Sequence, residues 1–573
     1  MRRHLISIGA VLALGARALG AQGALPPAIA ADVARLFNAP AAVRATGALV
    51  VRADQIVAGD VAVLEGPVTI AGRVTGRVLI VNGDVTLERG ARIDGDLIVI
   101  GGRVSGQDVA TIGGQVQRFE PQLRYHADGD RIVAEIGEVV PDTGHRAPTR
   151  WLRKLHCREV SPICPLLIGG SYNRVEGLPI EVGPSLVLGN DRARLRVDAL
   201  GVVRTVDNFR WTSENLGHDV TAKLSDAHDR EFAVGGRLYD VVEPTERWQL
   251  RDTEIGLASF FFRRDYRDYY NRHGGNGSLT LKNGHGVALT FTLADEVWTD
   301  RRDRSPFSLF SNDAAWRANP QMDAGHFHIG SLALEIDTKS DDQNPRTGWW
   351  IVAEAERGSS PAVTLSPFSL LARGMSSGGP PVPVTYMRGF LDLRRYNRLS
   401  PTGQLNMRLV LGGRLGGDPL PLERRLALGG PGTLPGFDFR NTPGAVDVMT
   451  CSAYGPLAGK AALCERIALA QLELRGGFGL QAHGHGEIED WFLDVDHGAQ
   501  WVLFGDMGRG WLVGGDARLG ELHYREAAFP PLKTFQGDVG VGLDFNFIGF
   551  FVAKAVSEPK EPMNFFVRLR HRF

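Results

Sequence analysis

Few residues of this chain have the type and spacing that catalysis or metal binding requires. The best candidates are two pairs of alternating histidines: His483 and His485, which lie near Glu487 and Glu489, and His326 and His328. Each pair could share one strand face as metal ligands. A polar face on a solvated strand is the simpler interpretation of both pairs, because such faces commonly carry these residues.

Motifs for enzymatic chemistry are missing from the sequence. It contains no Gly-x-Ser-x-Gly elbow, no His-Glu-x-x-His motif and no phosphate-binding loop. We therefore expect no enzymatic activity, no cofactor and no resident metal ion. Charge is balanced, with 64 Lys and Arg against 65 Asp and Glu, so no basic field argues for nucleic acid as a partner.

The 4 cysteines fall into two local pairs, Cys157 with Cys164 and Cys451 with Cys464. In an oxidising compartment, two local disulfides are the natural interpretation, although three connectivities are formally open. A metal site is the rival hypothesis. It would need ligands from two distant segments, whereas zinc usually takes closely spaced pairs.

The N-terminus carries the features of a secretory signal peptide. Met1-Arg2-Arg3-His4 is followed by an apolar run, Leu5 to Leu14, and then by small residues. We predict a signal peptide over residues 1–21; a buried helix is the alternative. No later segment supplies the long apolar run of a membrane helix, which leaves a soluble secreted protein or a β-barrel as the two broad classes.

Short apolar runs punctuated by glycine follow a short helical cap predicted over residues 22–45. Between residues 46 and 118, Gly72, Gly76, Gly83, Gly90 and Gly95 recur at near-regular intervals. Such a repeat lets each short strand stack on the one below, with glycine at the corners. We expect a small parallel β-helix here, and the stretch resembles the bactofilin-type polymer-forming repeat. A small sandwich or meander is the alternative. Residues 119–164, which are rich in proline, read as a linker or plug.

From residue 165 to 573 the pattern is strand after strand. Leu405, Met407 and Leu409 alternate with Gln404, Asn406 and Arg408, and other segments repeat this period of two. One apolar and one charged face is the signature of an outer-membrane barrel, with lipid outside and water inside. A soluble sandwich could show the same alternation. The long polar stretches 299–326 and 357–385 are predicted to be extracellular loops.

The last strand is amphipathic up to the C-terminus. Phe565, Val567, Leu569 and Phe573 are expected on one face, opposite a row of arginines. An aromatic end in register with the lipid face resembles the terminal strand that bacterial assembly machinery recognises on barrel substrates.

Four segments in order resemble the bacterial surface antigen barrels, the superfamily of BamA-like assembly factors and two-partner secretion transporters. They are the hairpin 336–348 with Asp337, Thr338, Pro345 and Gly348; the strand and loop 420–437 with Gly429, Gly430, Pro435, Gly436 and Phe437; the strand 502–508 with Asp506; and the strands 537–545. The resemblance implies an all-β transmembrane barrel of sixteen strands over residues 165–573, with the loop folded into the lumen. Some members also carry a disulfide just after the loop motif, where Cys451 and Cys464 stand.

Two departures separate the chain from that family. The family's loop arginine reaches an acidic residue on the barrel wall, a geometrically specific contact, but here Pro435 stands in its place. Asp506, the expected wall partner, remains, and Arg440 is a candidate substitute because only arginine offers the planar fork. The β-helix also replaces the mixed α/β periplasmic domains of the family's insertases.

These observations predict a barrel in the bacterial outer membrane, with its N-terminal domain in the periplasm. It would transport or assemble protein or another envelope component, gated by the loop 430–441. The alternative is a structural anchor whose β-helix is a periplasmic scaffold or oligomerisation module. The expected partners are outer-membrane lipid, the barrel assembly machinery, a polypeptide client and further copies of the chain through the β-helix.

Overall fold

The computed structural model describes residues 27–573 except 41, 120–121, 124, 129–130, 135–150, 155–162, 191, 207–209, 227–231, 284–285, 311–314, 341–344, 374–378, 401–402, 441–446, 453–459, 478–498, 515–521, 526, 546–547 and 570. The predicted signal peptide therefore lies outside the described residues. The chain divides into two compact units, residues 1–137 with 338–348, and residues 138–337 with 349–573.

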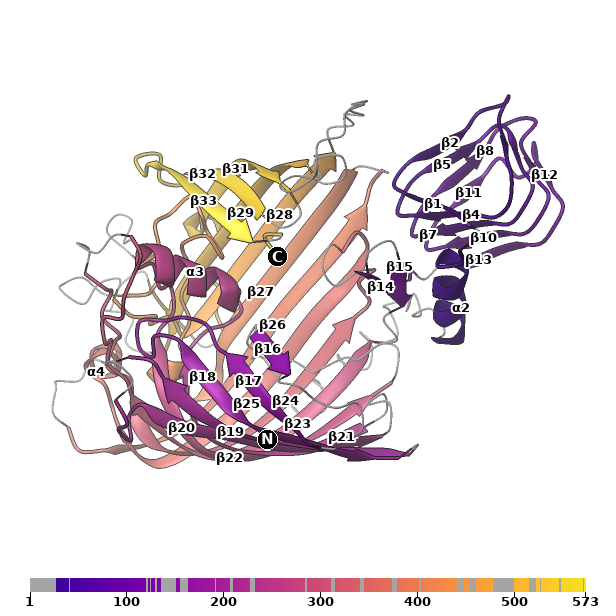
Figure 1. The fold of residues 1–573 in the computed structure, drawn as a ribbon. Helices are drawn as coiled ribbons and strands as arrows, with labels where there is room; N and C mark the ends of the chain where they lie inside the picture. The colour runs from indigo at the N-terminus through magenta and orange to yellow at the C-terminus, as the bar shows by residue number, and fades with distance from the viewer. Residues whose placement is uncertain are drawn as a thin grey trace. The chain divides into compact units, whose positions relative to one another are not determined.

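The first unit is built on a parallel β-solenoid (Figure 1). Its three sheets have the orders β1-β4-β7-β10-β13, β2-β5-β8-β11 and β3-β6-β9-β12. The strands are β1 Val43–Thr46, β2 Leu49–Val51, β3 Ile56–Val57, β4 Val61–Leu64, β5 Val68–Ile70, β6 Arg73–Val74, β7 Val78–Val81, β8 Val85–Leu87, β9 Arg92–Ile93, β10 Leu97–Ile100, β11 Val104–Ser105, β12 Thr111–Ile112 and β13 Val116–Phe119.

Stacked glycines allow the rungs of the solenoid to approach at its corners. A Cβ added at Gly83 would lie 2.2 Å from the carbonyl oxygen of Gly66, and one added at Gly102 would lie 1.8 Å from that of Gly83. No side chain fits at such distances, so glycine is a steric requirement at positions 83 and 102. Inside the coil, valine and isoleucine side chains such as Val63, Ile80 and Val99 are fully buried.

Helix α2 Pro27–Phe37 covers the side of the first sheet. Its Val33 and Phe37 pack with Leu64 and Leu79, which alternate with the residues that point into the coil. The hairpin of β14 Tyr125–Asp128 and β15 Arg131–Ala134 joins the same cluster. The predicted short helix is therefore present, but it lies against a face of the solenoid, because β4 and β7 are apolar on both faces.

The second unit is one large antiparallel sheet. Its strands are β16 Trp151–Lys154, β17 Ile163–Gly169, β18 Pro179–Gly189, β19 Ala193–Arg204, β20 Leu216–Asp226, β21 Phe232–Pro244, β22 Tyr269–Lys282, β23 Val287–Asp300, β24 Ala324–Asp337, β25 Gly348–Thr364, β26 Val382–Arg398, β27 Gly403–Gly417, β28 Arg466–Gly477, β29 Gln500–Val513, β30 His523–Tyr524, β31 Gln536–Asp544, β32 Ile548–Ala555 and β33 Met563–Leu569.

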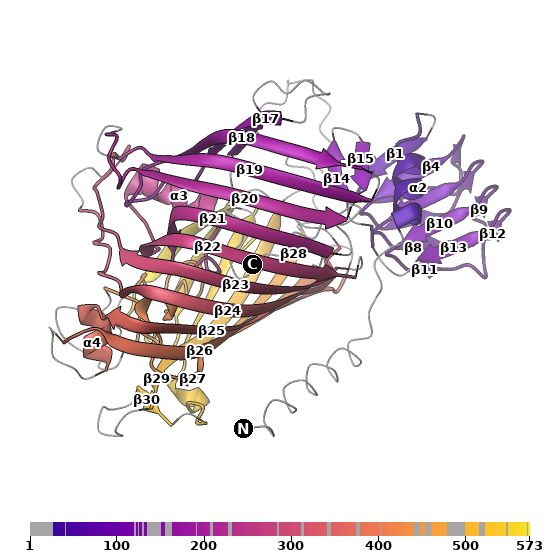
Figure 2. The same cartoon turned by 90° about the horizontal axis from the view of Figure 1, so that it is seen from below.

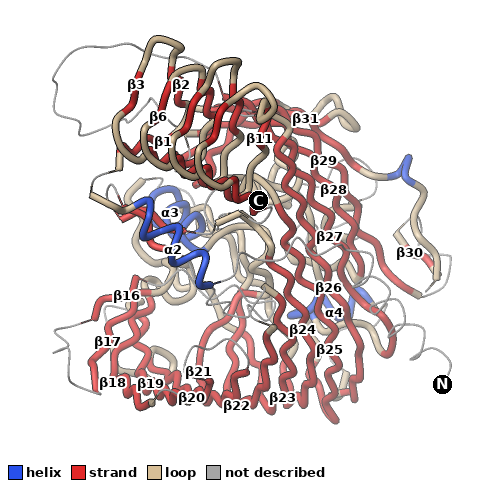
Figure 3. The backbone as a smooth tube through the Cα atoms, turned by 90° about the vertical axis from the view of Figure 1, so that its right-hand side faces the viewer, coloured by secondary structure: helices blue, strands red, loops and turns tan. Residues whose placement is uncertain are grey.

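Strands neighbouring in the sequence are neighbours in this sheet. The order runs from β16 to β33, with β29 pairing with β31 past the short β30. Setting aside β30 and the four-residue β16, 16 of the 18 strands in the described part of the chain form the meander. The sheet curls round on itself (Figures 2 and 3), and in the strand order β16 is at one end and β33 at the other. The predicted fold class, an all-β chain with a parallel β-helix ahead of a large antiparallel barrel sheet, is confirmed.

The two faces of the sheet have opposite character. Apolar side chains on the outer face are exposed, for example Leu238, Leu293, Leu472, Val541 and Phe565. Charged side chains on the inner face are buried, among them Glu296, Asp392, Arg408, Glu473 and Asp506. The inner charges pair with each other: Asp392 accepts hydrogen bonds from Arg394 and Arg408 at 2.7 Å each. The alternation alone left undecided whether the lumen is open or plugged; in the structure, these charges on the inner face are buried and paired.

Connections at one end of the sheet are mostly short, and those at the other end are long. The short ones include 190–192, 283–286, 399–402 and 545–547, with 478–499 as an exception. The long ones are 245–268 with α3 Asp252–Phe262, 301–323, 365–381 with α4 Pro367–Ala372, 418–465 with the 3₁₀ turn η2 Leu422–Arg424, and 514–535 with β30 and η4 Leu532–Thr534. The predicted loop 357–385 is shorter than expected, because β25 continues through Thr364.

Among the described residues, no helix has the length and apolar character needed to cross a membrane.

Candidate functional site

The connection between β27 and β28, residues 418–465, folds onto the inner face of the sheet. Most of its described residues are buried, including Leu422, Leu434 and Phe437 in the main hydrophobic cluster. Gly429 and Gly430 both adopt positive φ, 97° and 83°, which favours glycine at this turn. We call residues 418–465 the inner loop. Its predicted motif residues lie together in this segment.

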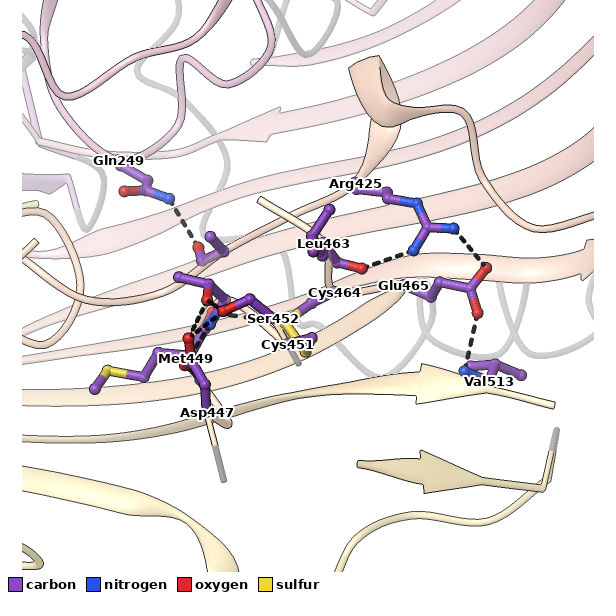
Figure 4. The surroundings of a disulfide bond; sticks show 12 residues. Gln249, Arg425, Asp447, Met449, Cys451, Ser452, Leu463, Cys464, Glu465 and Val513 are labelled. Carbon is purple, nitrogen blue, oxygen red and sulfur yellow. Dashed lines mark hydrogen bonds and ion pairs between the residues drawn. A yellow bond between two sulfur atoms is a disulfide. The ribbon is translucent and has the colours of Figure 1, made fainter. Parts of the chain in front are cut away.

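A disulfide between Cys451 and Cys464 closes the returning limb of the inner loop (Figure 4). Nearby, Arg425 donates to the carbonyl oxygen of Leu463 at 2.8 Å and lies 3.7 Å from the carboxylate of Glu465. Glu465 in turn accepts from the backbone N–H of Val513 in β29 at 2.9 Å. The limb is therefore held to the wall where it enters β28. Of the other predicted pair, Cys157 lies outside the described residues and Cys164 lies in β17.

Arg424 fastens the inner loop to the wall formed by β22–β26. Its Nε donates to Oε1 of Glu356 in β25 at 2.7 Å, and its Nη1 donates to the hydroxyl of Tyr270 in β22 at 2.9 Å. The guanidinium also lies 4.3 Å from the ring centroid of Trp298. Tyr386 donates to the same Glu356 oxygen at 2.7 Å. A buried guanidinium with a carboxylate, a phenol and an aromatic face is a well-satisfied cation.

The tip of the inner loop lies against the last strands of the sheet. The backbone N–H of Gly436 donates to Oδ2 of Asp538 in β31 at 2.7 Å. A Cβ at Gly436 would lie 2.5 Å from the Cβ of Asp538 and 2.7 Å from the backbone nitrogen of Ala555. Asn564 of β33 donates to the carbonyl oxygen of Pro435 at 3.2 Å. Glycine at 436 is thus what permits the close approach.

The connection 245–268 packs on both the inner loop and β33. Gln249 donates to the carbonyl oxygen of Ala427 at 2.9 Å. Glu254 of α3 accepts from the side chain of Arg568 at 2.7 Å and from the backbone N–H of Leu569 at 2.9 Å. On its other side, α3 accepts a hydrogen bond from Ser171 at the carbonyl oxygen of Asp252, at 2.6 Å. Helix α3 therefore contacts both the start and the end of the sheet.

Arg440 does not reach Asp506. It forms an ion pair at 2.7 Å with Asp268, which follows α3, and donates to the carbonyl oxygen of Lys460 at 3.1 Å. Burial opposes ionisation of Asp268, but the surrounding arginines, Arg317 first, hold its pKa well below the usual range. Nearby, burial raises the pKa of Glu246 to about 7, against the opposing effect of Arg440.

Asp506 is paired instead with Arg572 from the C-terminal tail, and it also accepts from Gln471 at 3.2 Å. The guanidinium of Arg572 lies 3.7 Å from the ring centroid of Phe504. Arg572 thus occupies the place at Asp506 that the family resemblance assigns to an arginine at position 435. It comes from a different segment of the chain. The sequence alone gave no means of pairing residue 572 with residue 506.

Phe573 does not share the outer face with the other residues of the predicted assembly signal. Phe565 and Val567 are exposed on that face, and Leu569 is half-buried. Strand β33 ends at Leu569, and Phe573 is buried. The tail turns inward because His571 pairs with Asp544 at 3.0 Å and Arg572 pairs with Asp506.

The predicted hairpin motif stands at the turn between β24 and β25. Asp337 ends β24, and Gly348 begins β25 with φ 110°. A Cβ at Gly348 would lie 2.1 Å from the carbonyl oxygen of Thr338, so glycine is required there. Pro345 lies in the turn. The histidine and glutamate residues at 483–489 lie outside the described residues.

Sequence reasoning missed the two residues that fasten the inner loop most firmly, Arg424 and its partner Glu356. The available signal was the charged triplet Glu423-Arg424-Arg425 between leucines, since charges set in an apolar segment are buried only when paired. The arrangement can hold or release a loop.

No protein-family model matches the chain, and no curated protein does so. Among solved structures, BamA from Haemophilus ducreyi lacking POTRA domains 1–3 aligns with a TM-score of 0.40 and 13% identity, over 75% of this chain and 76% of that one. CdiB from Acinetobacter baumannii aligns with a TM-score of 0.28 and 10% identity, over 74% of this chain and 66% of that one.

Proposed function

We propose that this chain is an outer-membrane barrel that transports or assembles polypeptide or another envelope component, and that the inner loop gates its lumen. The observation that carries the proposal is the loop's double attachment. Arg424 fastens it to Glu356 on one wall, and Gly436 fastens its tip to Asp538 near the other end of the sheet. These polar contacts add to the apolar packing of the loop, and removing one of them should favour its release.

Placement in a membrane is supported by the apolar outer face and the charged inner face of the sheet. Soluble proteins rarely expose a continuous apolar surface, yet the outer face of β21–β24 alone exposes Val234, Leu238, Leu279, Leu281, Leu289, Phe291, Leu293 and Leu332. The buried inner charges complete the pattern of a transmembrane barrel. The bacterial outer membrane is where such barrels occur.

The alternating connection lengths support one orientation in that membrane. Outer-membrane barrels have short periplasmic turns and long extracellular loops. We therefore assign the short turns to the periplasm and the long connections, including the inner loop, to the cell exterior. We propose that the solenoid lies in the periplasm.

The test is single-channel conductance of the purified full-length chain in planar bilayers, with Arg424→Gln as the variant. Removing one partner of a buried ion pair costs about 3–5 kcal/mol, so the variant should release the inner loop. We expect small or rare openings for the unmodified chain and at least about tenfold more open time for Arg424→Gln. Arg196→Gln is the matched control, because Arg196 is half-exposed and pairs with Asp198 on its own strand.

Equal conductance in all three proteins would overturn the gating role of the inner loop. A barrel that stays closed in every form would favour the second candidate, a structural anchor with a periplasmic scaffold. The solenoid supports that alternative, because its first rung exposes Val43, Val50 and Ile56 and end rungs with free edges invite stacking. Its test is the oligomeric state of the full chain in detergent: Ile56→Lys should convert a self-associated form to monomer.

A further inference from the structure

Two histidines and an aspartate converge on the outer face of the sheet. His326 and His328 alternate along β24, and both side chains are exposed on the face that carries Leu332. Asp295 of β23 stands directly opposite His328 in the register, on the same face as Phe291 and Leu293. The sequence pattern alone favoured an ordinary polar strand face for these histidines. The pairing of the strands adds a third ligand, a carboxylate, which no spacing along the sequence could show.

The three side chains are arranged as ligands of one ion. Their potential ligand atoms all lie within 4.8 Å of one another. Asp295 already contacts both histidines. Nε2 of His326 is hydrogen-bonded to Oδ1 of Asp295, and Nδ1 of His328 lies 3.2 Å from Oδ2. The two imidazole ring centroids are 4.9 Å apart. A carboxylate drawn between two imidazoles brings one oxygen and two nitrogen donors to a common point.

We propose that Asp295, His326 and His328 bind a divalent transition-metal ion of the zinc class on the outer wall of the barrel. Imidazole nitrogen and carboxylate oxygen, at about 2.0–2.2 Å from the metal, are the donors that zinc takes when Cys is not used. Three protein ligands leave at least one coordination position open. Only side-chain rotations are needed, because the three side chains project from rigid strands and are half or more exposed.

A shallow groove beside the triad keeps the open coordination position accessible. It has a volume of about 760 Å³ and is lined by Asp295, His328, Gly277 and Gly330. The glycines hollow the surface: a Cβ at Gly330 would meet only Leu293, at 3.6 Å, and one at Gly277 would meet only a carbonyl oxygen at 4.0 Å. Water can therefore complete the metal's coordination from the groove.

The outer face also changes character at this level. On β23 and β24, the apolar side chains Leu289, Phe291 and Leu332 are followed by Asp295, His326 and His328 toward the end of the sheet that carries the long connections, with Val297 as the one exposed apolar side chain among the described residues at this level of the two strands. The metal site thus stands at the margin of the apolar band, where an ion and its water ligands need not be buried in hydrocarbon. The site does not depend on whether the inner loop gates the lumen.

The experiment is isothermal titration of the purified full-length chain in detergent with ZnCl₂, after removal of bound metal with a chelator. We expect one saturable site per chain, weakened at least tenfold by Asp295→Asn and abolished by His326→Asn with His328→Asn. Cobalt(II) in place of zinc should give visible absorption in the unmodified chain that is absent from the double variant.

The matched control is His218→Asn with His273→Asn. These two histidines are also neighbours on the outer face, with ring centroids 6.0 Å apart, and His273 lies 4.0 Å from Asp240. Removing them should leave zinc affinity and stoichiometry unchanged. The proposal is overturned if the unmodified chain shows no saturable site, if the triad variants bind as tightly as the unmodified chain, or if the control variant loses the site. Unheated gel mobility confirms that each variant is folded.

Discussion

Gly436 and Arg424 carry the attachment of the inner loop in different ways. Gly436 permits the attachment because it has no side chain: any Cβ would displace the loop tip from Asp538 and Ala555. Arg424 makes the attachment through its guanidinium, which contacts Glu356, Tyr270 and Trp298 on three different strands. The wall carboxylate Asp506 is held by Arg572 rather than by a loop arginine. At the scale of residues, the resemblance pointed to Asp506 as the wall partner of the loop, whereas the loop tip meets Asp538 and Asp506 meets Arg572.

Glu246 should make the segment 245–251 sensitive to pH. Burial raises the pKa of this carboxyl to about 7, above the value of an unfolded chain, so the folded segment retains a proton that the open segment releases. Its stability is therefore greatest near pH 4.5 and falls as the pH rises to about 7, by at most about 3 kcal/mol. The charged groups that face it are Arg440 and Asp268, and Gln249 donates to it at 2.6 Å.

Hydrogen exchange of the peptides covering 245–251, corrected for intrinsic rates, measures this effect. Protection should be higher at pH 5 than at pH 8 in the unmodified chain and independent of pH in Glu246→Gln. An unmodified chain whose protection rises with pH would contradict the assignment.

The elements of the solenoid are set by the contact between successive rungs. Each parallel strand pairs with the equivalent strand one turn on, as Val61–Leu64 pairs with Val78–Val81. Carboxylates repeat the same step: Asp60 accepts from the backbone N–H of Arg77 at 2.8 Å, and Asp84 accepts from that of Arg103 at 2.9 Å. The Arg77 side chain, which also bonds Asp60, holds the pKa of that carboxyl below its ordinary value.

Gly83→Ala should destabilise the solenoid by about 1–3 kcal/mol, the usual cost of overpacking. The added Cβ would lie 2.2 Å from the Gly66 carbonyl oxygen, and backbone cannot yield as a flexible side chain can. Limited proteolysis of the full chain reads out the loss, as faster cleavage within residues 43–119. Thr86→Ala, on an exposed position of β8, is the control. Resistance equal to that of the unmodified chain would show that the glycine columns are not needed.

Helix α3 links the two ends of the large sheet at the scale of the whole molecule. It accepts hydrogen bonds from Ser171, ahead of β18, and from Arg568 and Leu569 of β33. Strand β33 is the last of the sheet in the order that the described residues define. Glu254 therefore satisfies polar groups at an edge that would otherwise be open to pairing.

Glu254→Gln should loosen β33. A hydrogen bond to a charged group is worth about 1.5–3 kcal/mol, so hydrogen-exchange protection of residues 563–569 should fall by at least about tenfold. Glu558→Gln, in the connection between β32 and β33, removes a charge of the same sign nearby and should leave protection unchanged. If both variants behave alike, α3 does not hold the last strand.

The sequence by itself determined the classes of structure. Period-two alternation fixed the strands and their two faces, and regular glycine fixed the solenoid, because both signals are local to the chain. The family resemblance also located the inner loop. Its glycines allow a tight turn and a close approach to the wall. Only the tertiary structure decided the partners: Arg424 with Glu356, Arg572 with Asp506, and Asp295 with two histidines. Those pairs depend on strand register and on how far the sheet curls, and neither quantity is encoded in the spacing of residues along one segment.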